Sequence, residues 1–112
     1  MSRVRLTRLL TLEERVAAPD GAGGAEVAWR PLGALWADMR ARAAREDLVA
    51  GRPLPRVSWR ILVRAAPAGA PSRPLPEQRL REGARIFDIL AVSEHGPDGR
   101  HLEIFAEEGV AA

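Results

Sequence analysis

Apolar and polar residues alternate every second position through much of this chain, and this period of two is the feature that most restricts its fold. In the clearest run, Val57, Trp59, Ile61 and Val63 occupy alternate positions. Successive side chains of a β-strand point to opposite faces, so a run of this kind indicates a strand with one buried face. Similar alternation, with turn residues between the runs, predicts an antiparallel meander made of residues 10–16, 26–30 and 35–40.

Proline and glycine mark the boundaries of the remaining elements. Residues 19–24 predict a hairpin turn, and the proline-rich residues 65–78 predict an extended, solvated loop. Residues 84–92 are apolar on both faces and predict the central strand, and a turn at 96–99 leads into its hairpin partner at 102–106. With about six strands, the chain is predicted to be mainly β and to form a small β-barrel or sandwich.

One segment breaks the period of two. From Ala43 to Ala50 the composition is rich in alanine, Ala44 and Leu48 lie four residues apart, and Gly51 stands where a helix C-terminus would be capped. These features predict a short helix between two strands. The segment has no Ser, Thr, Asp or Asn as N-cap, which leaves an ordered loop as the alternative.

Length and composition exclude several classes of protein. The 112 residues suffice for a single domain, 1–112, with one modest core. Cysteine is absent, which excludes disulfides and thiolate metal sites, and lysine is absent, which excludes a P-loop. No apolar run approaches the roughly 18 residues of a membrane span, and the N-terminal residues do not fit a secretory signal, so we expect a cytoplasmic protein with no membrane partner.

No group of residues forms a specific chemical site. His95 and His101 flank the last turn without a third ligand, so no metal or other cofactor is expected. Ser93 lies two residues from His95 but lacks the surroundings of a catalytic nucleophile, so the chain is not expected to be an enzyme. Adjacent carboxylates on a strand point to opposite faces, and we interpret three such pairs as solvated charges: Glu13–Glu14, Glu46–Asp47 and Glu107–Glu108.

The three tryptophans divide into two groups. Trp29 and Trp59 lie on the apolar registers of their strands and are expected in the core. Trp36 shares a face with Asp38 and Arg40, opposite the apolar register. It is expected either to cover the edge of the core or to project into a protein interface, where Trp and Arg are enriched.

Arginines are densest around the predicted helix, and Glu46 and Asp47 interrupt them; they are Arg40, Arg42, Arg45, Arg52 and Arg56. The formal net charge of the whole chain is only +2. We therefore interpret this cluster as solvated or as contacting other subunits, with transient contact to a phosphate backbone as the alternative.

The order of several short motifs carries a resemblance to a known family. They are V-x-W at 27–29, L-W-A-D-M at 35–39, R-E-D-L at 45–48, W-R-I-L-V-R at 59–64 and G-A-R-I-F-D-I-L-A-V at 83–92. In this order, over about residues 5–108, they resemble the phage head-tail joining proteins, which are head-closure or stopper components of tailed phages. The arginine-rich, GC-biased composition is also similar to that of gene transfer agents, which are phage-like particles.

The resemblance implies a small β-barrel that assembles into a ring of six or twelve copies in the neck of the particle. The implied partners are portal-adaptor proteins, a tail terminator or tail tube, and double-stranded DNA in the channel. The excursion at 43–56 would project toward the DNA and help to retain it. On this resemblance, the residues expected to face the channel are Arg42, Arg45, Glu46, Asp47, Arg52 and Arg56. The residues expected in the subunit interface are Trp36 and Arg40.

The loop at 65–78 is longer than the family pattern, so its contacts are not implied by the resemblance. Two alternatives stand beside the head-closure role: a stand-alone nucleic-acid-binding β-barrel, and a different neck role such as adaptor or tail terminator. The resemblance implies assembly in the bacterial cytoplasm, followed by a place in the finished particle.

Overall fold

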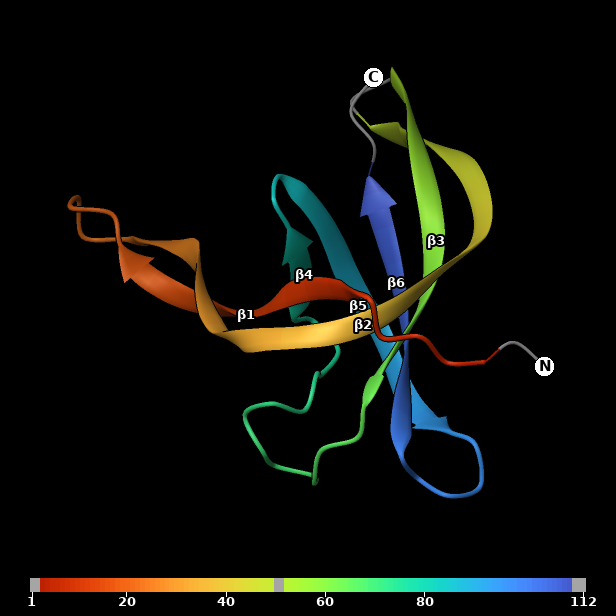
Figure 1. Cartoon of the computed structure of the whole chain (residues 1–112). Helices are drawn as coiled ribbons and strands as arrows, with labels where there is room; N and C mark the ends of the chain where they lie inside the picture. The colour runs from red at the N-terminus through yellow and green to blue at the C-terminus, as the bar shows by residue number, and fades with distance from the viewer. Residues whose placement is uncertain (1–2, 50–51, 110–112) are drawn as a thin grey trace.

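The computed structural model describes residues 3–49 and 52–109, of which 45–49 and 52–54 are described as backbone. The chain forms six antiparallel strands that close into a barrel in the order β1-β2-β3-β6-β5-β4 (Figure 1). Their bounds are β1 Arg8–Pro19, β2 Ala25–Val49, β3 Arg52–Arg64, β4 Arg79–Glu82, β5 Arg85–His95 and β6 His101–Gly109. The prediction of a small, mainly β barrel of about six strands is confirmed.

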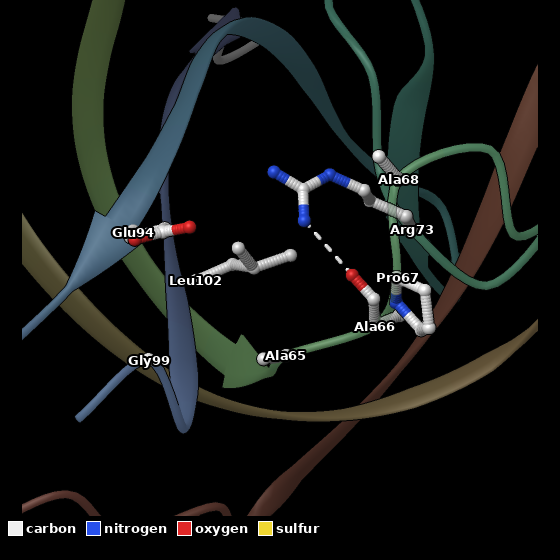
Figure 2. A pocket seen from close by; sticks show the side chains of 8 residues that line it. All are labelled: Ala65, Ala66, Pro67, Ala68, Arg73, Glu94, Gly99 and Leu102. Atoms are coloured by element: carbon white, nitrogen blue, oxygen red, sulfur yellow. Dashed lines mark hydrogen bonds between the residues drawn. The ribbon is translucent and has the colours of Figure 1, made fainter.

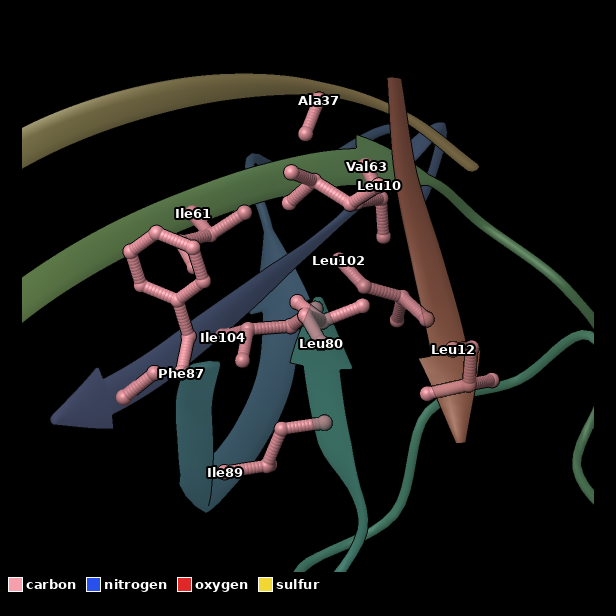
Figure 3. Close-up of a cluster of buried hydrophobic side chains, with 11 residues drawn as sticks. Leu10, Leu12, Ala37, Ile61, Val63, Leu80, Phe87, Ile89, Leu102 and Ile104 are labelled. Atoms are coloured by element: carbon pink, nitrogen blue, oxygen red, sulfur yellow. The ribbon is translucent and has the colours of Figure 1, made fainter. Parts of the chain in front are cut away.

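Side chains that alternate with a period of two in the sequence point alternately to the inside and the outside of this barrel. Along β6, Leu102, Ile104 and Ala106 are buried and alternate with half-buried residues on the outer face. Every strand contributes to the same interior cluster (Figure 3). Its members are Leu10, Leu12, Ala37, Ile61, Val63, Leu80, Phe87, Ile89, Leu102, Ile104 and Ala106.

The helix predicted over 43–50 is wrong for the part of it that the structure describes. β2 continues as a strand to Val49 and pairs with β3 from Ala37↔Val63 to Val49↔Arg52. The helix preference of alanine is weak, and pairing with a neighbouring strand outweighs it. Ala50 and the expected cap Gly51 lie outside the described residues.

The strands predicted at 26–30 and 35–40 are joined into this same β2. The chain passes Pro31 and Gly33 through a bulge: Leu12 pairs with Gly33 and Glu13 with Pro31, so Leu32 is the extra residue. Gly33 has a φ of 147°, which a residue with a side chain rarely adopts. A glycine at this position therefore allows the strand to bend and continue where a turn was expected.

Two hairpins extend beyond the closed part of the barrel (Figure 1). Residues 14–19 of β1 pair only with 25–30 of β2, and we call this ribbon the β1–β2 arm. It ends in the predicted turn, where Asp20 Oδ1 accepts hydrogen bonds from the backbone N–H groups of Ala22 and Gly24. The second extension is the far part of the β2–β3 hairpin, residues 46–49 and 52–55, before β3 meets β6 at Arg56↔Gly109.

β4 is the shortest strand and closes the barrel. It pairs with β1 at only three positions, Thr11↔Arg81, Leu12↔Leu80 and Glu13↔Arg79. Residues 65–78 form a loop before it, which contains turns and the fully buried Pro74 and so differs from the extended, solvated loop that was predicted. In the parts of the chain that the structure describes, no helix is long and apolar enough to cross a membrane.

Candidate interaction surfaces

The outer face of β1 and β2 carries exposed apolar side chains in a row. Leu9 and Trp36 are cross-strand partners, and their side chains are 48% and 55% exposed. Further along, on the same face of the arm, Ala17 is paired with Val27, which is 53% exposed. We call these four residues the outer strip. Trp36 thus projects outward and does not cover the edge of the core, and its place in a protein interface stays a prediction.

Leu9 is one member of this strip that the sequence analysis missed. It breaks the alternation, because it directly precedes the buried Leu10 on the same strand. An apolar residue on the register that points outward, next to an apolar residue that points inward, was the sequence signal that could have identified Leu9. Only the register with β2 places it beside Trp36.

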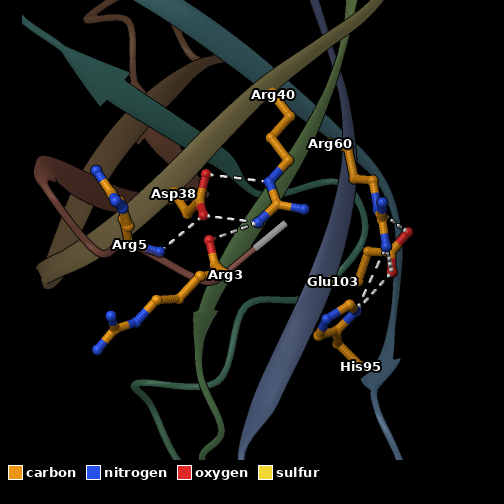
Figure 4. A network of polar contacts seen from close by, with 7 residues as sticks. All are labelled: Arg3, Arg5, Asp38, Arg40, Arg60, His95 and Glu103. Atoms are coloured by element: carbon orange, nitrogen blue, oxygen red, sulfur yellow. Dashed lines mark hydrogen bonds and ion pairs between the residues drawn. The ribbon is translucent and has the colours of Figure 1, made fainter. Parts of the chain in front are cut away.

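Arg40 lies on the outer face of β2 and belongs to an ionic cluster (Figure 4). Its guanidinium donates to Asp38 at 2.9 Å and to the carbonyl of Arg3 at 3.2 Å, and Asp38 also accepts from the backbone N–H of Arg5 at 2.8 Å. The bond from Arg40 is the main cause that lowers the pKa of Asp38. These contacts hold the N-terminal residues against β2.

A second ionic cluster lies on the neighbouring strands (Figure 4). Arg60 of β3 donates to both carboxylate oxygens of Glu103 on β6, at 2.7 and 3.0 Å, and lowers the pKa of that carboxyl. His95 Nδ1 lies 3.3 Å from Glu103. Ser93 is exposed, and His95 contacts Glu103 and Arg60 instead. Among the described residues, no three His, Asp or Glu side chains are grouped as metal ligands would be.

Glu108 closes the barrel end next to the β4–β5 turn. It is only 6% exposed and accepts hydrogen bonds from Arg85, at 2.7 and 2.9 Å, and from the Trp59 indole at 3.0 Å. Arg8 and Glu82 form a second ion pair beside it. Because the bond from Arg85 outweighs the cost of burial, the pKa of Glu108 is lowered. The interpretation of Glu108 as a solvated charge is therefore wrong.

Aromatic rings and arginines are stacked at this same barrel end. The rings of Trp59 and Phe87 meet edge to face, with centroids 5.9 Å apart. The guanidinium groups of Arg8 and Arg85 lie 6.0 and 5.6 Å from the Trp59 ring. Trp59 packs against the core, as expected. We call the group of five side chains at this barrel end the ionic plug; it consists of Arg8, Trp59, Glu82, Arg85 and Glu108.

Glu13, another carboxylate interpreted as solvated, is 4% exposed, so that interpretation is also wrong for this residue. Burial raises its pKa, but hydrogen bonds from Arg79 at 2.7 Å and Arg81 at 3.0 Å more than compensate, and the pKa is lowered. The Arg79 guanidinium also lies 4.1 Å from the Trp29 ring. Trp29 is half-buried beneath this arginine and outside the core cluster, contrary to the expectation.

The opposite barrel end is covered by the loop at 65–78 (Figure 2). Arg73 donates across the loop to the carbonyl of Ala66 at 2.8 Å. A hollow remains between the loop and the strands, with Glu94 on the side opposite Arg73 and the buried Leu102 between them. This end is closed by a loop and small side chains in place of an ionic network.

The predicted channel-facing residues are only partly described. Arg42 is the extra residue of a bulge in β2, and its guanidinium lies 5.1 Å from the Phe105 ring on the outer face. Arg56 is half-buried at the start of the β3–β6 pairing. The side chains of Arg45, Glu46, Asp47 and Arg52 lie outside the described residues. Contact of these six residues with DNA stays a prediction.

The surfaces described above combine exposed apolar side chains with several charges that are paired to one another. Residues 1–109 match the model of the phage head completion protein family. The chain belongs to this family. The resemblance inferred from the short motifs is thereby confirmed, and the broad function is that of a head completion protein, a structural class that is typically non-enzymatic.

A solved structure supports the same assignment. The head completion protein is 51% identical to a chain of the virion of a native gene transfer agent particle, with a TM-score of 0.87. The match covers 98% of the present chain and 100% of the other. No curated protein matches this head completion protein.

Proposed function

We propose that this protein forms a ring in the neck of a gene transfer agent or phage particle, between the portal-adaptor proteins and the tail, and closes the DNA-filled head. The observation that carries the proposal is the match to a gene transfer agent chain over nearly the full length of both chains. In this proposal the protein assembles in the bacterial cytoplasm and remains in the finished particle.

In the proposed ring, neighbouring subunits contact one another through the outer surface of the barrel. Most strand edges are paired in the closed barrel, and the exceptions include the arm and the part of β5 beyond Ile89, which pairs with β6 alone. In this proposal neighbours meet through outward side chains or through these edges. Trp36 and Arg40 lie on the outer face of β2 and are the proposed contact residues. Trp36→Ala should leave the melting temperature nearly unchanged, because the side chain is exposed, and should lower the yield of complete particles.

The far part of the β2–β3 hairpin is the proposed contact with DNA. It extends beyond the closed barrel, and its sequence places Arg45 and Arg52 close to Glu46 and Asp47. Mixed charge would hold the phosphate backbone weakly, which suits a protein that must release DNA during ejection. Arg42 and Arg56 lie at the base of the same hairpin.

The stand-alone nucleic-acid-binding barrel is less well supported. Such a protein binds through a face of uncompensated positive charge. Here several of the described arginines of the barrel wall are paired with carboxylates: Arg40 with Asp38, Arg60 with Glu103, and Arg79 and Arg81 with Glu13.

Shortening the hairpin tests the role in DNA retention. A deletion between Ala44 and Pro53 should leave the barrel folded, because the described strand residues there pair only with each other, before β3 meets β6 at Arg56, and the filled heads should lose DNA. A deletion of equal length within loop 65–78 serves as the control. Heads that keep their DNA at wild-type levels with the shortened hairpin would overturn this part of the proposal.

Imaging of particles tests the position in the neck. The protein should form a ring of density between the portal and the tail, and particles lacking it should have heads without tails. Density next to the portal alone, or at the end of the tail tube, would assign it instead to the adaptor or the tail terminator role.

A further inference from the structure

A basic hollow lies where the chain passes β2 before it enters β1. Most of the residues that line it are charged; they are Arg3, Arg5, Thr7, Arg8, Asp38, Met39 and Arg40. Asp38 is the one carboxylate among these lining residues, and it is paired with Arg40. Arg8 is paired with Glu82 of β4. The hollow therefore has an excess of positive charge, and this excess comes from Arg3 and Arg5.

The guanidinium groups of Arg3 and Arg5 have no carboxylate partner in the part of the chain that the structure describes. The contacts of these two residues are made by their backbone: the carbonyl of Arg3 accepts from Arg40, and the N–H of Arg5 donates to Asp38. Both residues are exposed, and in Figure 4 their guanidinium groups extend away from Asp38. Each guanidinium is therefore available to donate hydrogen bonds to an incoming anion.

The same backbone contacts fix the two side chains in a row. A third bond, from the N–H of Thr7 to the carbonyl of Ala37 at 3.0 Å, holds the other end of the segment. Exposed and half-buried residues alternate along residues 3–7, as they do in an extended chain. Residues two apart in such a chain point the same way and are separated by about 6.6 to 6.8 Å. Arg3 and Arg5 thus present two positive charges at a spacing similar to that of successive phosphates along a nucleic-acid strand.

This row leads to the base of the hairpin that is the proposed contact with DNA. Arg40, which holds the carbonyl of Arg3, lies on β2 two residues before Arg42. Arg42 is exposed and stacks on Phe105, and within the described residues it has no carboxylate partner either. Arginine side chains without a carboxylate partner are therefore found both beside β2, at residues 3–5, and at the base of the β2–β3 hairpin.

We propose that Arg3 and Arg5 bind the phosphate backbone of double-stranded DNA, as a second contact beside the β2–β3 hairpin. This inference rests on the proposed function, in which DNA passes the protein in the neck. DNA is the occupant because the row presents unpaired charges at a repeating spacing and leads to the hairpin. Contacts to phosphates carry no sequence information, and they weaken with salt because each neutralised phosphate releases counterions.

The salt dependence of DNA binding tests this contact. The full-length protein is titrated against a labelled DNA duplex at several salt concentrations. Arg3→Gln/Arg5→Gln should make the slope of log affinity against log salt shallower by about 2, because each phosphate contact contributes about 0.9. Its loss of affinity relative to wild type should be about tenfold larger at about 50 mM than at about 200 mM salt. The melting temperature should stay near that of wild type, because both side chains are exposed.

Two further variants separate position from total charge. Arg15→Gln/Arg64→Gln is the matched control: it removes the same charge from two other exposed arginines, on the β1–β2 arm and at the end of β3, and should keep the wild-type slope. Arg3→Lys/Arg5→Lys keeps the charge at the proposed site and should retain most of the slope. Two duplexes of different sequence should give the same result.

The outcomes separate this inference from the proposed function. A slope lowered by Arg3→Gln/Arg5→Gln alone supports the contact. Equal changes in both glutamine variants would overturn it, as would a wild-type protein that binds no DNA at low salt. A variant that binds DNA normally but fails to enter particles would assign the row to an acidic protein surface and also overturn it. In all of these cases a ring of wild-type protein in the neck leaves the proposed function standing, whereas particles without this protein in the neck would overturn the proposed function.

Discussion

The barrel end next to the β4–β5 turn and the end beneath the loop at 65–78 are closed in different ways. At the first, the ionic plug fills the opening with long side chains from the strands, and buried Glu108 bonds to Arg85 and Trp59. At the second, a proline-rich loop covers the opening and Arg73 holds it through a carbonyl. The first closure depends on ionised groups, whereas the bond that holds the loop involves no carboxylate. Acid should therefore act on the first closure, and also on the buried Glu13 that links β1 to β4.

The two closures differ in whether the charged side chains also cover an apolar group. Arg8 and Arg85 lie against the Trp59 ring, so their apolar stems shield the aromatic ring while their charged groups pair with carboxylates. A loop closes an opening without burying charge, and it leaves a hollow over Leu102. The plugged end therefore couples packing to ion pairing, whereas the loop over Leu102 is held by a bond to a carbonyl.

The largest effect is expected from removing the aromatic pair at the plugged end. Phe87→Ala and Trp59→Ala should each lower the free energy of unfolding by about 3 to 5 kcal/mol, because both remove a large side chain that packs in or against the core. Equilibrium unfolding in denaturant measures this loss of free energy for each variant. A loss from Trp59→Ala below that of a typical surface variant would mean that the plug does not stabilise the barrel.

A smaller loss is expected from Glu108→Gln. The amide keeps the shape of the side chain but weakens the bonds from Arg85, and hydrogen bonds to charged groups contribute about 1.5 to 3 kcal/mol. Glu94→Gln at the other barrel end is the matched control and should change stability by less than about 0.5 kcal/mol, because Glu94 is exposed. Equal losses in the two variants would remove the distinction between the ends.

The same glutamate should make stability depend on pH. The pKa values of Glu108 and Glu82 are lowered in the folded protein, by the bonds from Arg85 and Arg8 respectively. Their contribution is therefore complete above the unfolded pKa of about 4.3 and is lost as pH falls through the lower folded values. Unfolding measured from pH 7 down to pH 3 should show a shallower decline for Glu108→Gln than for wild type. Parallel curves would contradict this origin of the acid sensitivity.

The smallest effect is expected at the loop end. Arg73→Ala removes one hydrogen bond to the carbonyl of Ala66, which corresponds to about 0.5 to 1.5 kcal/mol. The loss should be independent of pH between 3 and 7, since no carboxylate is involved in that bond. A pH-dependent loss would show that this end, too, relies on ionised groups.

The strands were largely predictable because their signal is local. The alternation around Ile61 and Leu102 needs no partner to be recognised, and both residues are buried where it places them. The end of β2 was not predictable in this way, because its strand conformation comes from pairing with β3 and its alanines by themselves favour a helix.

The charged side chains of the barrel were not predictable, because their partners are distant in the sequence. Glu13 pairs with arginines 66 and 68 residues away, and Glu108 with Arg85, 23 residues away. Each carboxylate by itself has the appearance of an ordinary surface charge. Exposure of Trp36 was foreseen as one of two alternatives, since it follows from strand register alone, but its neighbour Leu9 required the pairing of β1 with β2.

The short β4 determines where this barrel opens most readily. With three paired positions to β1, the seam between these strands has less backbone hydrogen bonding to lose than the other junctions, so its amide protons should exchange with solvent by local opening while the rest stays protected. Glu13 spans that seam through Arg79 and Arg81. Its two bonds add to the three paired positions that hold the seam, so we expect the seam to open at a lower free energy than global unfolding and to open more readily when Glu13 is protonated.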